Sequence, residues 1–258
     1  IQSLTNNIIW NIFADQEHNI WLGTDYGISL SRYNSALQFI PISQITGTGD
    51  GNQFYSLFRD SKGFYWFGGT NGLIRFTDPA GDKHNAIWYR MGDKTYPLSH
   101  NRIRHIYEDK EQQLWIATDG SINRYDYATR QFVHYNIVDS TGTYNTNWTY
   151  YMFEDNAGHL WISTCLGGIF VVDKHRLMQS ASGQYVAEQN YSVHNGLSGM
   201  FINQIIPDNE GNVWVLLYNN KGIDKINPRT REVTKLFADE LNGEKSPNYL
   251  LCDEDGML

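Results

Sequence analysis

The sequence has few cysteines and few charged side chains. Only Cys165 and Cys252 occur among 258 residues, and charged residues make up 19% of the chain. Two cysteines cannot build the disulfide framework of a small secreted domain, and neither lies at a metal-binding spacing. Their places in the repeat described below are far apart, so we expect two free thiols. We also expect no metal, because the eight histidines are scattered without a pair at ligand spacing. No cofactor is expected either.

Basic residues and long apolar runs are also scarce. Twenty Lys and Arg face 28 Asp and Glu, giving a net charge of −8 and a pI near 5.4. This balance argues against a nucleic-acid surface and against binding to an anionic membrane. No apolar run approaches the ~20 residues that span a bilayer. Because the chain begins at Ile1 without a signal-peptide pattern, we expect it to be part of a longer protein.

A short motif recurs along the whole chain. Its fourth copy runs Asp-Asn-Ala-Gly-His-Leu-Trp-Ile-Ser-Thr from Asp155 to Thr164, and a sixth copy stops before its tryptophan. The tryptophans of the five complete copies are separated by 45, 49, 46 and 53 residues. The motif aspartates are Asp15, Asp60, Asp109, Asp155, Asp208 and Asp253. A period of this size indicates a repeat architecture.

Each copy has the pattern of a β-hairpin. An apolar run precedes the Asp, and a second run centred on Trp follows three residues after it. Asp accepts a hydrogen bond from the amide two residues on, and Gly supplies a left-handed position in the turn. His18 and Gln112 replace that Gly in two copies. The recurrent aspartates are therefore predicted to be structural, not catalytic.

Four strands per 45 to 53 residues, with no helix between units, predict an all-β fold of β-propeller type. We expect five complete four-stranded blades and the first strand of a sixth, as part of a larger array, since five blades plus one strand would leave open edges. A short helical turn is expected within residues 174–188. The predicted blades cover residues 4–41, 50–91, 98–136, 145–193 and 197–237, with a partial blade at 247–258 of one propeller region, 1–258.

The motif resembles the two-component regulator propeller repeat. Matching pieces are Trp21–Ile28, Ile122–Asp126 and Gly167–Asp173, and Leu98–Ile106 is similar to the usual entry to a blade of that family. Ser121 and Leu217 depart from the repeat at Gly and Thr positions. The resemblance implies the periplasmic sensor region of a hybrid two-component histidine kinase, anchored in the inner membrane and made of two seven-bladed propellers.

That resemblance also implies a role in signal transduction. The expected function is to recognise an oligosaccharide or another small ligand and so to control glycan-utilisation genes. The expected partners are that ligand and the remaining sensor domains of the same protein; a homodimer is left open, and no direct nucleic-acid contact is expected. The chain itself is not expected to be an enzyme, and the family offers no catalytic residues to carry over.

Alignment of the repeats on their Asp shows positions that the fold does not dictate. In a propeller the first strand of each blade lines the channel, and its beginning opens on the face where ligands bind. Aromatic planes beside Arg and Asn suit a sugar, whose C–H faces stack while its hydroxyls form hydrogen bonds. The alternative is that these aromatics only pack between blades. The candidate ligand-binding residues are Trp10, Tyr55, Arg102, Arg104, Trp148, Tyr150 and Asn203.

Two other functions remain open at this level. A propeller lyase or glycosidase would need paired carboxylates or a metal with a base at the channel mouth, and the aligned first-strand positions hold no acid. A protein-interaction scaffold would show a broad exposed patch. Propellers support all three functions, so the fold cannot choose among them.

Overall fold

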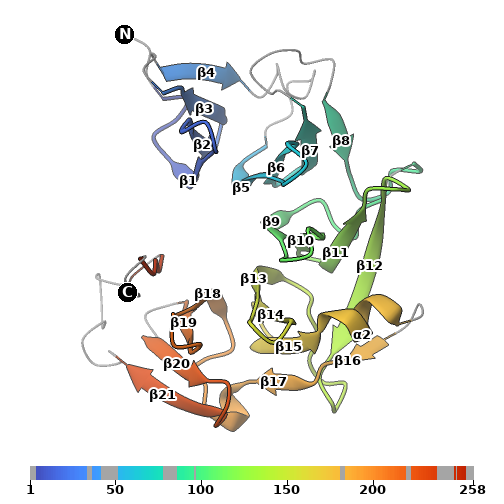
Figure 1. The fold of residues 1–258 in the computed structure, drawn as a ribbon, viewed down its shortest axis with the longest axis vertical. Coiled ribbons are helices and arrows are strands. Elements are labelled where there is room, and N and C mark those ends of the chain that lie inside the picture. Colours follow the sequence, from blue (N-terminus) through green and yellow to red (C-terminus); the bar gives the residue numbers. More distant parts are fainter. Residues whose placement is uncertain are drawn as a thin grey trace. The chain divides into compact units, whose positions relative to one another are not determined.

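The computed structural model describes residues 4–33, 37–41, 52–77, 86–95, 97–180, 184–218, 222–236, 247 and 249–253. Within these residues the chain forms five separate sheets, and in each of them four strands run antiparallel to their neighbours in chain order (Figure 1). The sheets are numbered here as blades 1 to 5 in chain order. No helix in this described part of the chain is long and apolar enough to cross a membrane.

Four antiparallel strands form the basic blade. Blade 1 contains β1 Ile9–Ala14, β2 Ile20–Thr24, β3 Gly27–Ser31 and β4 Leu37–Pro41. Blade 2 contains β5 Phe54–Arg59, β6 Tyr65–Gly69, β7 Gly72–Phe76 and β8 Ile87–Tyr89. Blade 3 contains β9 Ile103–Glu108, β10 Leu114–Thr118, β11 Ser121–Asp126 and β12 Gln131–Val138. Blade 4 contains β13 Thr149–Glu154, β14 His159–Thr164, β15 Ile169–Asp173 and β17 Gln189–Tyr191. Blade 5 contains β18 Ile202–Pro207, β19 Val213–Leu217, β20 Ile223–Asn227 and β21 Glu232–Leu236.

The chain divides into two compact units, described separately below. The first unit comprises 1–119 and 123–134, which hold blades 1 and 2 and most of blade 3. The second unit comprises 120–122 and 135–258, which hold blades 4 and 5 and the end of β12. Within the first unit the first strands β1, β5 and β9 contact one another in that order, and within the second unit β13 contacts β18.

Blade 3 departs from the predicted four strands because it has a fifth. Residues 174–188, inserted after β15, begin with helix α2 Lys174–Gln179, where a helical turn was expected. They then add strand β16 Gln184–Val186, which pairs in parallel with residues 136–138 of β12. The insertion is fixed at its start by a buried ion pair between Lys174 Nζ and Glu154 Oε1 at 2.8 Å. Blade 4 therefore contributes a strand to the sheet of blade 3.

The hairpin aspartates have the predicted structural role in all five complete repeats. In blade 2, Asp60 accepts hydrogen bonds from the amides of Lys62 (3.0 Å) and Phe64 (2.8 Å). The left-handed turn position follows, with φ of 85° at Gly63 in blade 2. His18 and Gln112 adopt the same region at 62° and 61°, so the turn keeps its form without Gly.

Each hairpin Asp also holds the motif tryptophan, a contact that we did not predict. The indole N–H donates to the second carboxylate oxygen at 2.7 to 3.0 Å in every complete repeat. In the first unit the indoles pack against aromatic rings of the following blade: Trp21 lies 5.2 Å from Tyr65, and Trp66 lies 4.9 Å from Tyr125. The repeated Asp and Trp thus form one structural device that links a turn to the core.

The start of the sixth repeat lies against blade 5. Of the predicted partial blade, Asn248 and 254–258 lie outside the described residues, and Tyr249 to Asp253 form no strand. The Gln204 side chain nevertheless forms two hydrogen bonds with the backbone of Leu250. Its Oε1 accepts from the Leu250 amide at 2.7 Å, and its Nε2 donates to the Leu250 carbonyl at 3.0 Å. Ser56 occupies the same repeat position as Gln204 and bonds the amide of Ile106 in the next blade at 3.0 Å. The two cysteines are free thiols, as predicted.

Candidate ligand-binding rim

A β-bulge lies near the start of the first strand in every blade. In blade 1, Ile9 pairs with Thr24 and Asn11 pairs with Gly23, so Trp10 has no partner residue opposite it. The same register shift occurs in the other four blades. The bulged residues are Trp10, Tyr55, Arg104, Tyr150 and Asn203, all of which were predicted site residues. A bulge re-aims the extra side chain out of the ladder and is typical of strands beside functional sites.

In the first unit these side chains form a continuous row. Trp10 meets the ring of Tyr55 edge-on with the centroids 5.2 Å apart, and its indole N–H donates to Asp25. Tyr55 donates from its hydroxyl to Gln53 at 2.7 Å. Trp10 is 48% exposed although it makes these contacts, so part of its ring is available to a ligand.

Arg104 continues the row on blade 3. Its guanidinium lies 5.8 Å from the centre of the Tyr55 ring, and two of its nitrogens reach Asp119 at 2.7 and 3.3 Å. Arg102 lies 3.9 Å from the same carboxylate and is the more exposed of the two arginines. The structure therefore brings the predicted arginines together on one carboxylate. This first-unit rim, Trp10, Tyr55, Arg102 and Arg104 with Asp25 and Asp119, combines aromatic faces with fixed charges.

The second unit has a more apolar rim. Tyr150 meets Phe201 edge-on at 5.1 Å, and Phe201 stacks on Tyr218 at 4.4 Å with 24° between the ring planes. Asn203 is the bulge residue of the adjacent strand. Trp148 and Tyr150 are two positions apart, a separation that places residues on one face of a regular strand. They do not belong to one regular strand here, because Trp148 precedes β13 with a left-handed φ of 56° and Tyr150 is bulged.

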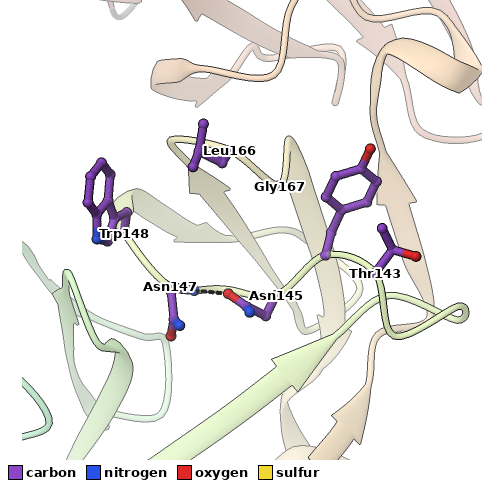
Figure 2. A pocket seen from close by; sticks show the side chains of 7 residues that line it. Thr143, Asn145, Asn147, Trp148, Leu166 and Gly167 are labelled. Carbon is purple, nitrogen blue, oxygen red and sulfur yellow. Dashed lines mark hydrogen bonds between the residues drawn. The ribbon is translucent and has the colours of Figure 1, made fainter.

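Beside Trp148 the second unit contains a small cavity (Figure 2), called the Trp148 pocket below. Its volume is about 310 Å³, and it is open to solvent. The residues that line it are Thr143, Tyr144, Asn145, Asn147, Trp148, Leu166 and Gly167.

The acids of the first-unit rim were missed in the sequence. Asp25 and Asp119 each lie ten residues after the hairpin Asp of their repeat, just past the second strand. Because the second strand runs antiparallel to the first, its end lies beside the start of the first strand. An alignment restricted to first-strand positions could not find them. Their shared distance from the hairpin Asp is the signal that would have done so.

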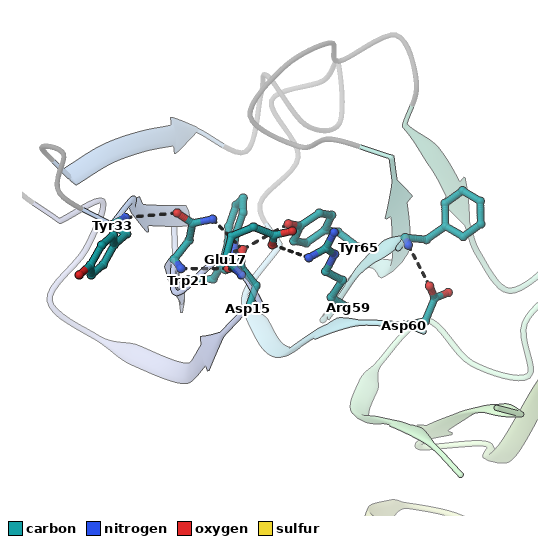
Figure 3. A network of polar contacts seen from close by, with 9 residues as sticks. Asp15, Glu17, Trp21, Tyr33, Arg59, Asp60 and Tyr65 are labelled. Atoms are coloured by element: carbon teal, nitrogen blue, oxygen red, sulfur yellow. Dashed lines mark hydrogen bonds and ion pairs between the residues drawn. The ribbon is translucent and has the colours of Figure 1, made fainter. Parts of the chain in front are cut away.

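The hairpin carboxylates belong to the core contacts and not to this rim. Figure 3 shows the first copy, where Asp15 accepts from Trp21 (2.8 Å) and from the Tyr65 hydroxyl of blade 2 (3.2 Å). Burial raises the pKa of Asp15, but the hydrogen bonds from Trp21, Asn19 and Tyr65 outweigh it and leave the pKa below its usual value. Burial and the charge of Asp15 raise the pKa of Tyr65 to about 12. Such a network fixes a charge and a ring for packing between blades 1 and 2.

Comparison with known proteins matches part of the chain to a family model. Residues 3–26, 48–71 and 97–120 match the family model described as the two component regulator propeller. Histidine kinase P4 of Formosa agariphila is 27% identical over 163 residues, which are 57% of this chain and 11% of that protein.

Solved structures give the same result for the fold. The extracellular domain of BT4673 from B. thetaiotaomicron, given as a hybrid two component system, is 95% identical, with a TM-score of 0.83. The match covers 99% of this chain and 34% of that one, so the present chain spans about a third of that domain. Virginiamycin B lyase from Staphylococcus aureus is 15% identical with a TM-score of 0.64, over 88% of this chain and 69% of that chain. The predicted all-β propeller fold is confirmed.

Proposed function

We propose that this β-propeller chain senses an oligosaccharide outside the cell. Three of its segments match the two component regulator propeller, which supports a sensory role. In this proposal it is a periplasmic part of the sensor region of a hybrid two-component histidine kinase that controls glycan-utilisation genes. The matches to an extracellular domain of a hybrid system and to a histidine kinase support that setting. The kinase and the other sensor domains would be its partners within the same protein.

The observation that carries the proposal is the composition of the first-unit rim. Exposed Trp10 offers an aromatic face, and the guanidinium of Arg104 is held in a fixed orientation by Asp119. A planar guanidinium donates to adjacent oxygens in a fixed geometry, which suits paired hydroxyls or the carboxylate of an acidic sugar. Because Arg104 is already oriented, little side-chain entropy is lost on binding.

Signalling places a further demand on the ligand. A ligand shifts a conformational equilibrium only by its difference in affinity for the two states. The ligand must therefore bind one arrangement of the sensor domains more tightly than another. A propeller face presents side chains from several blades, so a neighbouring domain or a second copy of the protein could contact it in one arrangement and not in another.

We propose that this region has no catalytic activity. The two rim carboxylates are engaged, Asp25 by the indole of Trp10 and Asp119 by Arg104. A general acid or base needs a pKa near the working pH and access to the reacting atom. We therefore expect no turnover of polysaccharides by the purified protein, and sustained hydrolysis or lysis that is lost on changing Asp25 or Asp119 would contradict this.

The proposed function is tested by calorimetric titration of the intact sensory region with a panel of oligosaccharides. Arg104→Ala should weaken binding of the ligand by ~1–3 kcal/mol, the cost of leaving a polar partner unpaired. Arg229→Ala is the matched control, because Arg229 lies exposed in the outer turn of blade 5. If a ligand is found and Arg104→Ala and Trp10→Ala both bind it like the wild type, the first-unit rim is not the site.

A further inference from the structure

The Trp148 pocket has the size of a site for one small ring. Its volume of about 310 Å³ is at the lower limit of the ~300–1,000 Å³ that ligand pockets span. Leu166, 67% exposed, and Trp148, 48% exposed, both line the cavity (Figure 2). Two large apolar side chains so exposed beside one cavity are a feature that packing within the blade does not explain.

Trp148 has a strained backbone conformation, with a left-handed φ of 56°. A left-handed φ is unfavourable for a bulky residue, and such strain is common at binding sites. The residues at the same repeat position, Ile8, Gln53, Arg102 and Phe201, do not have a left-handed φ. The Trp148 carbonyl accepts from the amide of Cys165 at 3.0 Å, which fixes the strained segment to the neighbouring loop.

The loop that carries Leu166 is longer than its counterparts in blades 1 to 3. Four residues separate β14 from β15, whereas two separate the second and third strands in each of those blades. Gly167 lets the longer loop lie against residue 145, since a Cβ there would be 2.8 Å from the Asn145 carbonyl oxygen. The side chain of Asn145 accepts from the amide of Asn147 at 2.9 Å and stabilises the segment that leads to Trp148. Backbone contacts thus fix both segments that line the pocket, residues 145–148 and the loop of residues 165–168.

The chemistry of the lining selects the class of ligand. It consists of an indole, a leucine, a phenol, two amides and a threonine hydroxyl, with no carboxylate, imidazole or ammonium group among these lining residues. A charged sugar would meet no counter-charge here, and burying a charge without a partner is costly. An aromatic face suits the C–H face of a pyranose, and amides suit its hydroxyls.

We propose that the Trp148 pocket binds one uncharged pyranose ring. This inference rests on the proposed function and deepens it, because it names the chemical class of the sugar unit, a neutral one, and a place within the second unit that would hold it. The ring stacks on Trp148, and Leu166 offers a second apolar contact in the same pocket.

The test follows the Trp148 indole directly. The whole chain is labelled with 5-fluorotryptophan, and the 19F resonance of Trp148 is assigned by its loss in Trp148→Phe. The probes are the methyl pyranosides of glucose, galactose, mannose and xylose, with glucuronate, galactose 6-sulfate and a mixture of short peptides as comparisons. We expect at least one neutral pyranoside to shift the Trp148 resonance, and the charged sugars and peptides to leave it unchanged.

Two variants separate binding from folding. Trp148→Ala should weaken the binding of an oligosaccharide ligand about tenfold. Trp148→Gly should lose the same affinity yet unfold at or above the wild-type temperature, because glycine adopts a left-handed φ without strain. A large loss of thermal stability in Trp148→Gly would show that the indole is needed for packing and would contradict the proposal.

The remaining outcomes distinguish this inference from the proposed function. The pocket is refuted if no neutral pyranoside moves the Trp148 resonance, or if charged sugars or peptides move it more. If an oligosaccharide binds with an affinity that Trp148→Ala leaves unchanged, the sensor proposal stands and the pocket fails. If calorimetry finds no oligosaccharide ligand, a pyranoside shift at Trp148 still supports the pocket, while the sensor proposal loses its ligand.

Discussion

Replacing Asp60 by asparagine tests the device that links each turn to the core. Asp60 is 3% exposed, and its second carboxylate oxygen accepts from Trp66 Nε1 at 2.7 Å and from the Tyr127 hydroxyl of blade 3 at 2.6 Å. Burial and this hydrogen bond to Asp60 raise the pKa of Tyr127 above its usual range, so Tyr127 remains a donor. The amide introduced by Asp60→Asn would present an NH₂ group to these donors, or would flip and present it to the turn amides of Lys62 and Phe64.

The expected loss follows from the number of donors affected. A hydrogen bond to a charged acceptor contributes about 1.5–3 kcal/mol. Either orientation of the introduced amide removes two such bonds, and the Tyr127 hydroxyl can recover part of one by rotating to accept. We therefore expect Asp60→Asn to lower the free energy of unfolding by about 2–4 kcal/mol, a large part of the ~5–15 kcal/mol that stabilises a typical domain.

The assay is urea unfolding followed by tryptophan fluorescence and far-UV circular dichroism. Asp126→Asn is the matched control: Asp126 also accepts two turn amides, but Asn227 makes the same two contacts in blade 5. That control should change stability by under about 1 kcal/mol. Tyr127→Phe completes a double-mutant cycle with Asp60→Asn. A loss in Asp60→Asn no larger than in Asp126→Asn would refute the role given to the hairpin carboxylates.

Three other predictions concern a core tryptophan, the hairpin carboxylates and a buried carboxylate of blade 5. Trp161→Ala should cost about 3–5 kcal/mol, because this 2% exposed indole stacks on Tyr191 at 5.5 Å; a shift under about 1 kcal/mol in urea unfolding would contradict it. Stability should fall as the pH drops below the usual Asp value of 3.8, because hairpin carboxylates with a lowered folded-state pKa lose their contribution as they protonate, and a melting temperature that stays flat from pH 5 to 2.5 would disprove this for Asp15, Asp155 and Asp208. Asp224→Asn should unfold at the wild-type temperature or above at pH 7, because burial raises the pKa of Asp224 and Asn123 makes the equivalent bonds to its own serine in blade 3; a decrease of more than about 1 kcal/mol would contradict it.

The hairpins could be predicted because their determinants are local. Asp, the left-handed position and Trp lie within seven residues, so a single stretch of sequence such as Asp60–Trp66 specifies the turn and its bond to the core. His18 and Gln112 adopt the left-handed region because the surrounding contacts of the turn remain the same. The blade count followed from the period of this one motif.

The details that shape the rim could not be predicted in this way. A bulge adds no visible gap to the sequence, so sequence alternation alone would place Trp148 and Tyr150 on the same face of one strand. The contact of Asp119 with Arg104 depends on where the second strand ends. The alternation of apolar and polar residues along that strand does not define this end. Strand β16 pairs with residues almost fifty positions earlier, and such pairing depends on tertiary contacts.

The fifth strand of blade 3 determines where this chain can be divided. Residues 139–148, between β12 and β13, look like a natural boundary between repeats, and a protease or a gene fragment cut there would separate blade 3 from the insertion that supplies β16. Residues 136–138 would then present free amides and carbonyls to other chains, which favours aggregation. Blade 3 therefore cannot be cut out or replaced at the boundary of its sequence repeat. A fragment or chimera that retains blade 3 must extend at least to Val186, the last residue of β16.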